Sequence, residues 1–524
     1  MIFIGPKLSN PDSHFRMNIV DSIGTSNDLL IDLCHHRKEE NIFDKIDEFL
    51  EKHSNERIVV YNPFIDDDFF FNFHERFPEL SLVTFFSDDE WRCFNYDRYI
   101  ALFSDVYAIT DRHHLKLYEQ WGFTNCVYTP WACNPKKFYR IGLCTKRYDV
   151  TFIGAAYGKR VEYIQYLAAN GINIKLFGSG WERFSELNKH HGGYVSSSDL
   201  VQIINESKIN LNFLWTSFDE EVFAVKGRTF ELAGCCAFQL CNSFKGVYEF
   251  FKDGIEVDTF RSKEELLEKV VYYLKNEEKR EEIAKRAYET IKKNHTWKNR
   301  FNAIFSVLES NSAKRRRFKA RIIVLTQGRI EDYDIPSSDE NIHIEVQRVE
   351  YGSANMSDKY DGVLILENPI QISARKLYMW TFGLAIGTNE FVVANFYTKD
   401  LDNNVWIRFT EKDISGENHK EIRNLPLESI LFRNVEAYEK FKRGEIGTTE
   451  FSVIEYPVFL AKGLSRRKTR KLRIKFGYYD RQHHLSQSLR RFKLFRVIGI
   501  IRDIFLQKGF SLIIRYFVAC LRLV

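Results

Sequence analysis

The fold of this 524-residue chain is predicted most clearly by one stretch, Tyr148-Asp149-Val150-Thr151-Phe152-Ile153-Gly154-Ala155-Ala156-Tyr157-Gly158-Lys159-Arg160. It begins with an apolar, strand-like segment that ends in a glycine-containing turn. A helix-like segment follows, from Val161 to Ala169. A strand, a turn and a helix in this order form the repeating unit of a parallel α/β sheet. We therefore predict that a doubly wound, Rossmann-like domain begins here.

The same alternation continues after this stretch. Further strand-like segments run from Asn173 to Phe177 and from Ile209 to Phe213, and the residues from Ser262 to Leu308 have a helical pattern. Apolar residues recur along that last stretch at the spacing of one helix face. We predict that this domain covers residues 146–312.

Upstream, residues 1–145 form another series of strand-like and helix-like segments, with Ile42 to Leu50 as an amphipathic helix. Strands that alternate with helices predict a parallel sheet. The chain is thus expected to begin with a first Rossmann-like domain. Its predicted strands are Ile2 to Gly5, Arg57 to Asn62, Leu82 to Phe86, Val106 to Thr110 and Cys126 to Thr129.

A basic run from Lys314 to Arg317 follows the second domain, and we interpret it as a linker because such a run does not enter a core. Beyond it we predict an accessory α/β domain over residues 320–460 and a basic, amphipathic helical tail over residues 461–524. The predicted strands of the accessory domain are Ile322 to Leu325, Ile342 to Val346, Val363 to Leu366 and Phe391 to Ala394.

Length and composition indicate a globular protein of several domains, with 44% apolar and 28% charged residues. The nine cysteines form no Cys-x-x-Cys pair, which argues against a disulfide framework and against a zinc knuckle. The first residues have the pattern of a strand and not of a secretory signal. We expect a cytoplasmic protein.

The charge is distributed unevenly along the chain. Residues 462–524 carry 17 Lys and Arg but only two acidic residues, so their net charge is +15 in a chain whose total is +5. Within 485–524 the cations alternate with Phe, Leu and Ile, and no charge-free run reaches the roughly 18 residues of a spanning helix. We expect this segment to bind an anionic membrane surface as a peripheral anchor, and we expect no nucleic acid partner. Packing against the accessory domain or a partner is the alternative.

Successive strand ends of the second domain carry groups suited to an anionic ligand. Ligands of doubly wound sheets bind beyond the carboxyl ends of the strands. Gly154 and Gly178 each follow a strand and permit close backbone approach, and Lys159 and Arg160 open the helix after the first of them. One such turn is ordinary, because turns after strands usually contain glycine. Their recurrence at successive strand ends indicates a binding site.

The next strand end carries the most informative run, Val225-Lys226-Gly227-Arg228-Thr229-Phe230-Glu231-Leu232-Ala233-Gly234-Cys235. Helix N-terminal amides together with Lys226 and Arg228 can neutralise phosphates. Glu231, one turn later, can accept hydrogen bonds from ribose hydroxyls. The run therefore predicts a site for a nucleotide diphosphate, and a merely solvated first helical turn is the alternative.

The segment from Asp149 to Arg300 resembles the C-terminal domain of CgeB-like, or spore-maturation type, glycosyltransferases, a branch of the GT-B glycosyltransferases. The resemblance extends over about the first 310 residues. Its matching elements are Phe152-Ile153-Gly154 with Tyr157-Gly158-Lys159-Arg160, Phe177-Gly178 with Trp181, Arg228-Thr229-Phe230-Glu231 with Ala233-Gly234, Tyr248-Glu249-Phe250-Phe251 before Gly254, and His295-Thr296-Trp297 with Arg300.

This resemblance implies a GT-B fold of two Rossmann-like domains and a hexosyltransferase-type activity in surface polysaccharide synthesis. The donor would be a UDP-, GDP- or dTDP-sugar, bound without a required cofactor, with Arg228 at the diphosphate and Glu231 at the ribose. The acceptor would be a saccharide or a lipid-linked saccharide on the side of the first domain.

One departure from the family pattern concerns catalysis. Retaining GT-B enzymes often carry a Glu-x7-Glu pair, but the residue eight positions before Glu231 is Phe223, and Asp219, Glu220 and Glu221 are out of register. The anomeric outcome therefore stays open. A nucleotide-sugar-binding or scaffold protein without turnover is the alternative function.

Catalysis also requires a group that accepts the acceptor's proton or stabilises developing charge. Asp88 and Asp89 follow the strand that ends at Phe86, which puts carboxylates at a strand's carboxyl end, although they also suit a helix cap. His113 is a further candidate. The His-His pairs lack metal-ligand spacing, so no metal is predicted.

The accessory domain contains Asp400-Leu401-Asp402 after a strand. Such a pair can hold a divalent cation against a sugar-nucleotide diphosphate, but a turn at Asp402-Asn403-Asn404 fits the sequence better. We therefore interpret this region as a degenerate or accessory transferase-like domain.

Overall fold

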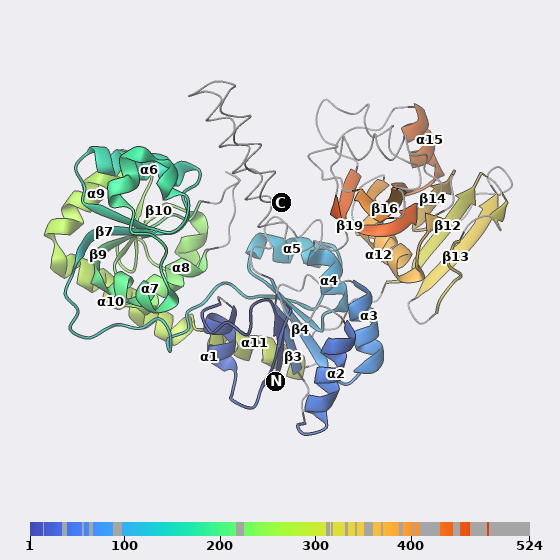
Figure 1. Cartoon of the computed structure of the whole chain (residues 1–524), viewed down its shortest axis with the longest axis horizontal. Helices are drawn as coiled ribbons and strands as arrows, with labels where there is room; N and C mark the ends of the chain where they lie inside the picture. Colours follow the sequence, from blue (N-terminus) through green and yellow to red (C-terminus); the bar gives the residue numbers. More distant parts are fainter. Residues whose placement is uncertain are drawn as a thin grey trace, which may run out of the picture. The chain divides into compact units, whose positions relative to one another are not determined.

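A computed structural model of the chain divides into two compact units, Met1–Arg317 and Phe318–Val524 (Figure 1). The structure describes residues 1–13, 15–33, 39–54, 57–61, 67–86, 97–215, 225–310, 315, 318–327, 329–330, 334–340, 343–350, 360–367, 370–386, 391–400, 403–407, 430–443, 451–461 and 479–480.

The first domain is built on a six-stranded parallel sheet in the order β2-β1-β3-β4-β5-β6. Four of its strands are buried at every residue or at all but the first, as expected for a sheet covered on both faces. The strands are β1 (Ile2–Gly5), β2 (Leu29–Asp32), β3 (Arg57–Tyr61), β4 (Ser81–Phe85), β5 (Val106–Ile109) and β6 (Cys126–Tyr128). The helices are α1 (Asp21–Ile23), α2 (Glu39–Leu50), α3 (Asp67–Arg76), α4 (Arg98–Phe103) and α5 (Arg112–Gln120), and a π-helix, η1, spans Arg16–Val20.

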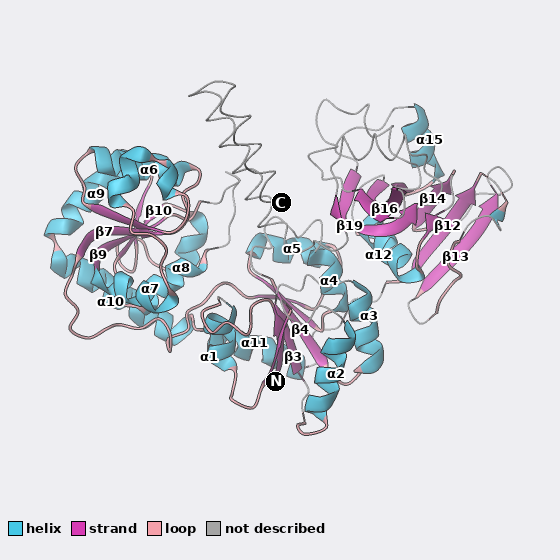
Figure 2. Cartoon of the chain, in the orientation of Figure 1, coloured by secondary structure: helices cyan, strands magenta, loops and turns pink. Residues whose placement is uncertain are grey.

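The second domain has a five-stranded parallel sheet in the order β11-β10-β9-β7-β8. Helices flank this sheet (Figure 2). Its strands are β7 (Tyr148–Ile153), β8 (Ile174–Phe177), β9 (Ser207–Asn212), β10 (Gln239–Asn242) and β11 (Asp258–Phe260). Its α-helices are α6 (Lys159–Ala169), α7 (Ser197–Glu206), α8 (Gly227–Gly234), α9 (Lys263–Lys275) and α10 (Glu277–Asn294). The short 3-10 helices are η4 (Trp181–Arg183), η5 (Ser185–His190) and η6 (Lys245–Glu249).

A last helix, α11 (Trp297–Glu309), returns from the second domain to the first. It starts with a capping box between Thr296 and Asn299 and packs against α1 and β5. Just before it, the chain forms a parallel bridge between Thr296 and Cys133 of the connection after β6. Two chain segments thus join the domains side by side.

Arg300 fixes this double connection. Its guanidinium donates to the carbonyl oxygens of Pro130 and Trp131 on one segment, and to that of Asn294 and to His295 Nδ1 on the other. Burial lowers the pKa of Arg300 to about 10. The closing motif singled out from sequence is therefore a structural clamp.

The second unit contains a mixed, nine-stranded sheet with the path β13-β12-β14-β18-β16-β17-β20, in which β15 pairs with β19 and β19 with β16. The strands are β12 (Ala320–Thr326), β13 (Ile344–Glu350), β14 (Gly362–Leu366), β15 (Ile370–Gln371), β16 (Phe391–Asp400), β17 (Asn403–Ile407), β18 (Ile430–Phe432), β19 (Phe451–Ala461) and β20 (Tyr479–Asp480). The helix α12 (Ala374–Ala385) packs against the sheet and is buried at every residue from Leu377 to Leu384, and α15 (Val435–Arg443) follows β18.

The prediction of two consecutive Rossmann-like domains followed by an α/β unit is confirmed. Sequence inspection missed β2, a short strand, and it named no strand at β10 or β11. The predicted turn over Asp402, Asn403 and Asn404 needs correction, because Asn403 pairs with Asp400 and both asparagines belong to β17. The predicted membrane-binding tail, 485–524, lies outside the described residues.

Candidate functional site

The carboxyl ends of β7 and β8 meet through two glycines. Gly178 has φ +118°, and a Cβ atom added there would lie 2.6 Å from the carbonyl oxygen of Gly154. Trp181, fully buried, donates from Nε1 to that same oxygen at 2.8 Å. The predicted close approach at Gly154 and Gly178 is therefore an approach of two loops to each other.

Lys159 and Arg160 begin α6 but face different surroundings. Lys159 is exposed, directly after Gly158 with φ +53°. Arg160 is buried, and its guanidinium donates to the carbonyl oxygens of Phe213 at 3.1 Å and Trp215 at 3.3 Å and lies 3.9 Å over the ring of Tyr157. Burial lowers its pKa. Arg160 thus holds the chain beyond β9, whereas Lys159 is open to a ligand.

The start of α8 is arranged to receive an anion. Lys226 is the N-cap residue in an extended conformation, and its side chain forms no capping hydrogen bond. Gly227 occupies the first helical position. A Ser, Thr, Asp or Asn at the cap would occupy the first amides of the helix. The Lys226 side chain leaves this position uncapped; the Thr229 amide donates to the carbonyl oxygen of Lys226 at 3.1 Å, and the positive end of the helix dipole suits an anion.

Arg228 and Glu231 form an ion pair one turn apart on α8. Arg228 NH1 lies 2.9 Å from Glu231 Oε2, and the exposed fractions of the two side chains are 27% and 6%. Among the described residues, no acceptor has hydrogen-bond geometry at NH1, so the contact with Glu231 is ionic and not a well-directed hydrogen bond. A nearly buried carboxylate is thus held beside a half-buried guanidinium.

Three buried polar side chains anchor the first turn of α8 to the sheet. Asn212 of β9 donates from Nδ2 to Thr229 Oγ1 and to Gln239 Oε1, both at 2.9 Å. Gln239 of β10 donates from Nε2 to the carbonyl oxygen of Thr229 at 3.1 Å. Because Thr229 directly follows Arg228, this network fixes where Arg228 and Glu231 lie.

The other end of α8 packs against the connection between the domains. A Cβ atom added at Gly234 would lie 2.3 Å from Cys133 Sγ, so only glycine permits this approach. Cys133 and Cys235 are both buried thiols whose pKa values burial raises. The final Ala-Gly of the predicted motif thus serves packing.

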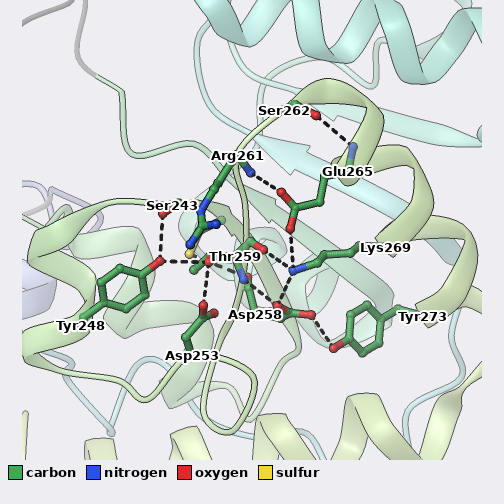
Figure 3. A network of polar contacts seen from close by, with 11 residues as sticks. Ser243, Tyr248, Asp253, Asp258, Thr259, Arg261, Ser262, Glu265, Lys269 and Tyr273 are labelled. Atoms are coloured by element: carbon green, nitrogen blue, oxygen red, sulfur yellow. Dashed lines mark hydrogen bonds and ion pairs between the residues drawn. The ribbon is translucent and has the colours of Figure 1, made fainter.

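A polar network fixes the edge of the sheet beside the site (Figure 3). Asp258 accepts hydrogen bonds from Lys269 Nζ at 2.8 Å and from Tyr273 at 2.5 Å. Thr259 bonds to the hydroxyl of Tyr248 at 3.1 Å, and Tyr248 belongs to η6. The network therefore ties η6, the segment after β10, to β11 and α9.

The residue after Tyr248 contacts the first domain. Glu249 Oε2 accepts a hydrogen bond from Arg112 Nε at 3.0 Å and one from the hydroxyl of Tyr128 at 3.3 Å. Arg112 also lies 4.3 Å over the ring of Tyr128. Burial and Glu249 raise the pKa of Tyr128. Sequence inspection assigned these three residues no role; the only signal was Glu249 within a family motif.

The predicted catalytic residues are only partly described. His113 lies in the first turn of α5, where its backbone amide donates to the capping carboxylate of Asp111 at 2.7 Å. It is next to Arg112 and thus at the carboxyl end of the first sheet. Asp88 and Asp89 lie outside the described residues, as does Phe223 with the neighbouring acidic run.

Two further findings concern metals and membranes. Among the residues that the structure describes, no group of three or more His, Cys, Asp and Glu side chains is placed to hold a metal ion. Over the same residues, no helix combines the length and apolarity needed to cross a bilayer. Of the Asp-x-Asp pair in the accessory domain, Asp400 is the last residue of β16, and Asp402 lies outside the described residues.

Comparison with known proteins bears on the domain that contains α8. Residues 160–306 match a family model described as glycosyl transferase-like. The second domain is thus glycosyl transferase-like over most of its length. A search among curated proteins found no match.

Several solved structures are similar to the chain. Sucrose-phosphate synthase from Thermosynechococcus elongatus matches at 11% identity, over 59% of this chain and 98% of that one, with a TM-score of 0.41. HepE from Anabaena, solved with UDP and glucose, matches at 11% identity over 59% and 99%, with a TM-score of 0.42. TarM matches at 9% identity and a TM-score of 0.35, over 48% of this chain and 54% of TarM, so the chain spans about half of TarM's length.

Proposed function

We propose that the chain is a glycosyltransferase that moves a sugar from a nucleotide-sugar donor to a saccharide or lipid-linked acceptor. The observation that carries the proposal is the start of α8, where a helix N-terminus without a side-chain cap from Lys226 and the cations Lys226 and Arg228 precede the buried carboxylate of Glu231. The glycosyl transferase-like match includes this helix. A donor of this kind presents a diphosphate and a ribose, the groups that these residues suit.

Each residue has a distinct role in the proposal. The α8 amides and Lys226 neutralise the diphosphate, and Arg228 adds a planar donor that can bond two phosphate oxygens. Glu231 accepts hydrogen bonds from the ribose hydroxyls. Gly154, Gly178 and Lys159 remain predicted donor contacts, and Arg160 supports them through the chain beyond β9.

For the transfer step we retain His113 as the candidate in the described part of the first domain. It adjoins Arg112, whose bond to Glu249 brings the carboxyl end of the first sheet against the second domain. Asp88 and Asp89 remain candidates from sequence. A nucleotide-sugar-binding protein without turnover is the second candidate function, because Phe223 stands where many retaining enzymes have glutamate.

Surface glycan synthesis, a cytoplasmic location and binding to an anionic membrane surface through 485–524 are further parts of the proposal. They rest on the sequence, in particular on the basic and aromatic residues of the tail.

The test is a thermal-shift panel of UDP-, GDP-, dTDP- and CMP-sugars. A donor at 100 times its Kd should stabilise the protein by about 2.7 kcal/mol. We expect one nucleotide series to stabilise the native chain, and we expect Arg228→Gln and Glu231→Gln to remove the part of the shift that binding at α8 contributes. Lys263→Gln, which removes an exposed cation paired with Glu162, is the matched control and should keep it.

The absence of a shift with every nucleotide would contradict the donor site. Donor hydrolysis or transfer, followed by release of the nucleotide, separates the two candidate functions. Binding that depends on Arg228 but gives no turnover with any offered saccharide favours the binding protein.

A further inference from the structure

The second unit has a topological switch point in the parallel part of its sheet. β12 is flanked by β13 on one side and β14 on the other, and both pair with it in parallel. The chain therefore leaves β12 toward one side and later returns to its other side. In open α/β sheets, ligands bind beyond the carboxyl ends of the strands at such a point.

The second domain follows the same rule. There β7 lies between β8 and β9, and the candidate donor residues follow the carboxyl ends of these strands and begin α8. The proposed donor site of the second domain thus lies where the switch-point rule predicts. The same rule applies to the parallel strands β12, β13 and β14 of the second unit.

The strands at the second unit's switch point end at the same level. Thr326, the last residue of β12, is in register with Leu366, the last residue of β14. The backbone amide of Gln327 continues the ladder by donating to the carbonyl oxygen of Leu366 at 3.0 Å. The residues directly after the two strands, Gln327 and Glu367, are therefore neighbours across the switch point.

Polar side chains occupy this position. Gln327 donates from Nε2 to Glu367 Oε1 at 3.4 Å, and both side chains are exposed. The strands beneath them are apolar and buried, since every residue of β14 and the last five of β12 are buried. Arg329, two residues beyond Gln327, is also exposed.

The chemistry of these groups indicates a ligand class. A carboxylate accepts hydrogen bonds from sugar hydroxyls, and a side-chain amide can both accept and donate them. An arginine can donate to two phosphate oxygens at once. We propose that the carboxyl ends of β12 and β14 form a second binding site, which takes a phosphorylated sugar such as a nucleotide-sugar through Gln327, Glu367 and Arg329. This site would give one chain two sugar-nucleotide sites in separate units.

The inference goes beyond the function proposed for the first unit and can be tested apart from it. The probes are the UDP-, GDP-, dTDP- and CMP-sugars of the first panel, titrated by calorimetry into the full chain. In Arg228→Gln/Glu231→Gln, where the first site is disabled, we expect one probe still to bind with a stoichiometry near one. Adding Glu367→Gln should weaken this residual binding about tenfold or more.

A matched control is Glu345→Gln, which changes an exposed carboxylate near the amino end of the neighbouring strand β13 and should leave residual binding unchanged. Glu367 is exposed, so its replacement should not affect folding, and an unchanged unfolding midpoint verifies this. Gln327→Leu provides a second variant at the same site.

The outcomes separate the two proposals. Binding that survives in the double variant and falls with Glu367→Gln supports the second site. No residual binding of any probe, or residual binding that neither Glu367→Gln nor Gln327→Leu weakens, overturns it. If binding to the native chain is unchanged by the replacements at Arg228 and Glu231 but is lost with Glu367→Gln, the first site is overturned and the second is supported.

Discussion

Arg228 NH1 and Glu231 Oε2 lie 2.9 Å apart on the first turns of α8, with the carboxylate almost fully buried. The two residues that the sequence assigns to different parts of a donor therefore contact each other. The guanidinium beside the buried carboxylate offsets much of the cost of burying it.

Arg228→Gln should lower the free energy of unfolding by about 1–3 kcal/mol, because it leaves a buried carboxylate without its charged neighbour. Glu231→Gln should cost less, since the more exposed Arg228 can turn toward water. Urea denaturation of both variants and of the double variant measures the coupling. Strictly additive losses would mean that the ion pair contributes nothing to stability.

Thr229→Val should reduce both stability and nucleotide affinity. It keeps the side-chain shape but removes the hydroxyl that accepts from Asn212, leaving a buried amide hydrogen unpaired at a cost of about 1–3 kcal/mol. Thr229→Ser keeps the hydroxyl and should retain affinity within a few fold. Calorimetric titration well below the unfolding temperature measures the nucleotide affinity of both variants. Equal affinities would mean that the hydrogen bonds of Thr229 stabilise the fold but do not affect nucleotide binding.

The sequence predicted the two Rossmann-like domains and the position of the candidate donor residues at the start of a helix after a strand for clear physical reasons. Buried parallel strands are continuous apolar runs, as at Val150 to Ile153, and glycine turns follow them. The cations and the carboxylate of α8 lie one turn apart in any helix. These features depend on local spacing and could be recognised without the structure.

Contacts between distant segments could not be predicted in this way. The bond from Arg112 to Glu249 spans 137 positions, and that from Asn212 to Gln239 joins adjacent strands whose order the sequence does not state. Arg160 has the expected position, but whether a cation after a strand faces a ligand or its own backbone depends on tertiary packing. β11 is only three residues long and begins with the charged Asp258, so the sequence shows no apolar run that would predict a strand there.

A glycine series should separate steric conflict from backbone strain. Gly178→Ala adds a Cβ only 2.6 Å from Gly154 O at a positive φ, so it should be the most destabilising. Gly158→Ala has open space but φ +53°, and should cost about 1 kcal/mol from conformation alone. Gly142→Ala has open space and no positive φ, and should be neutral or slightly stabilising. Thermal unfolding of the three variants gives the order, and a neutral Gly178→Ala would contradict the packing of the two loops.

The stability of the chain should fall as the pH decreases from about 6.5 to about 4, in part because of His295. Burial and the nearby Arg300 lower the pKa of His295 to about 4, with Glu256 opposing the shift, and Nδ1 lies 2.9 Å from the Arg300 guanidinium in a setting of Phe230, Phe250 and Phe251. The unfolded chain, with an ordinary histidine pKa, binds the proton first, so its population grows as acid is added. The contribution is fully present above pH 6.5 and is lost progressively toward pH 4. His74, whose pKa is also lowered to about 4 by burial and Arg315, should add to the slope.

Urea midpoints at pH 7.5, 6 and 5 measure this dependence. His295→Gln should flatten it and the further change His74→Gln should flatten it more, whereas His53→Gln, at an exposed position, serves as the control. Because His295 lies in the double connection between the domains, loss of its neutral form should loosen that connection first. An increase in proteolysis near Pro130 or Asn294 at pH 5 would report this opening, and a pH slope equal in the native chain and in His295→Gln would exclude His295 as its cause.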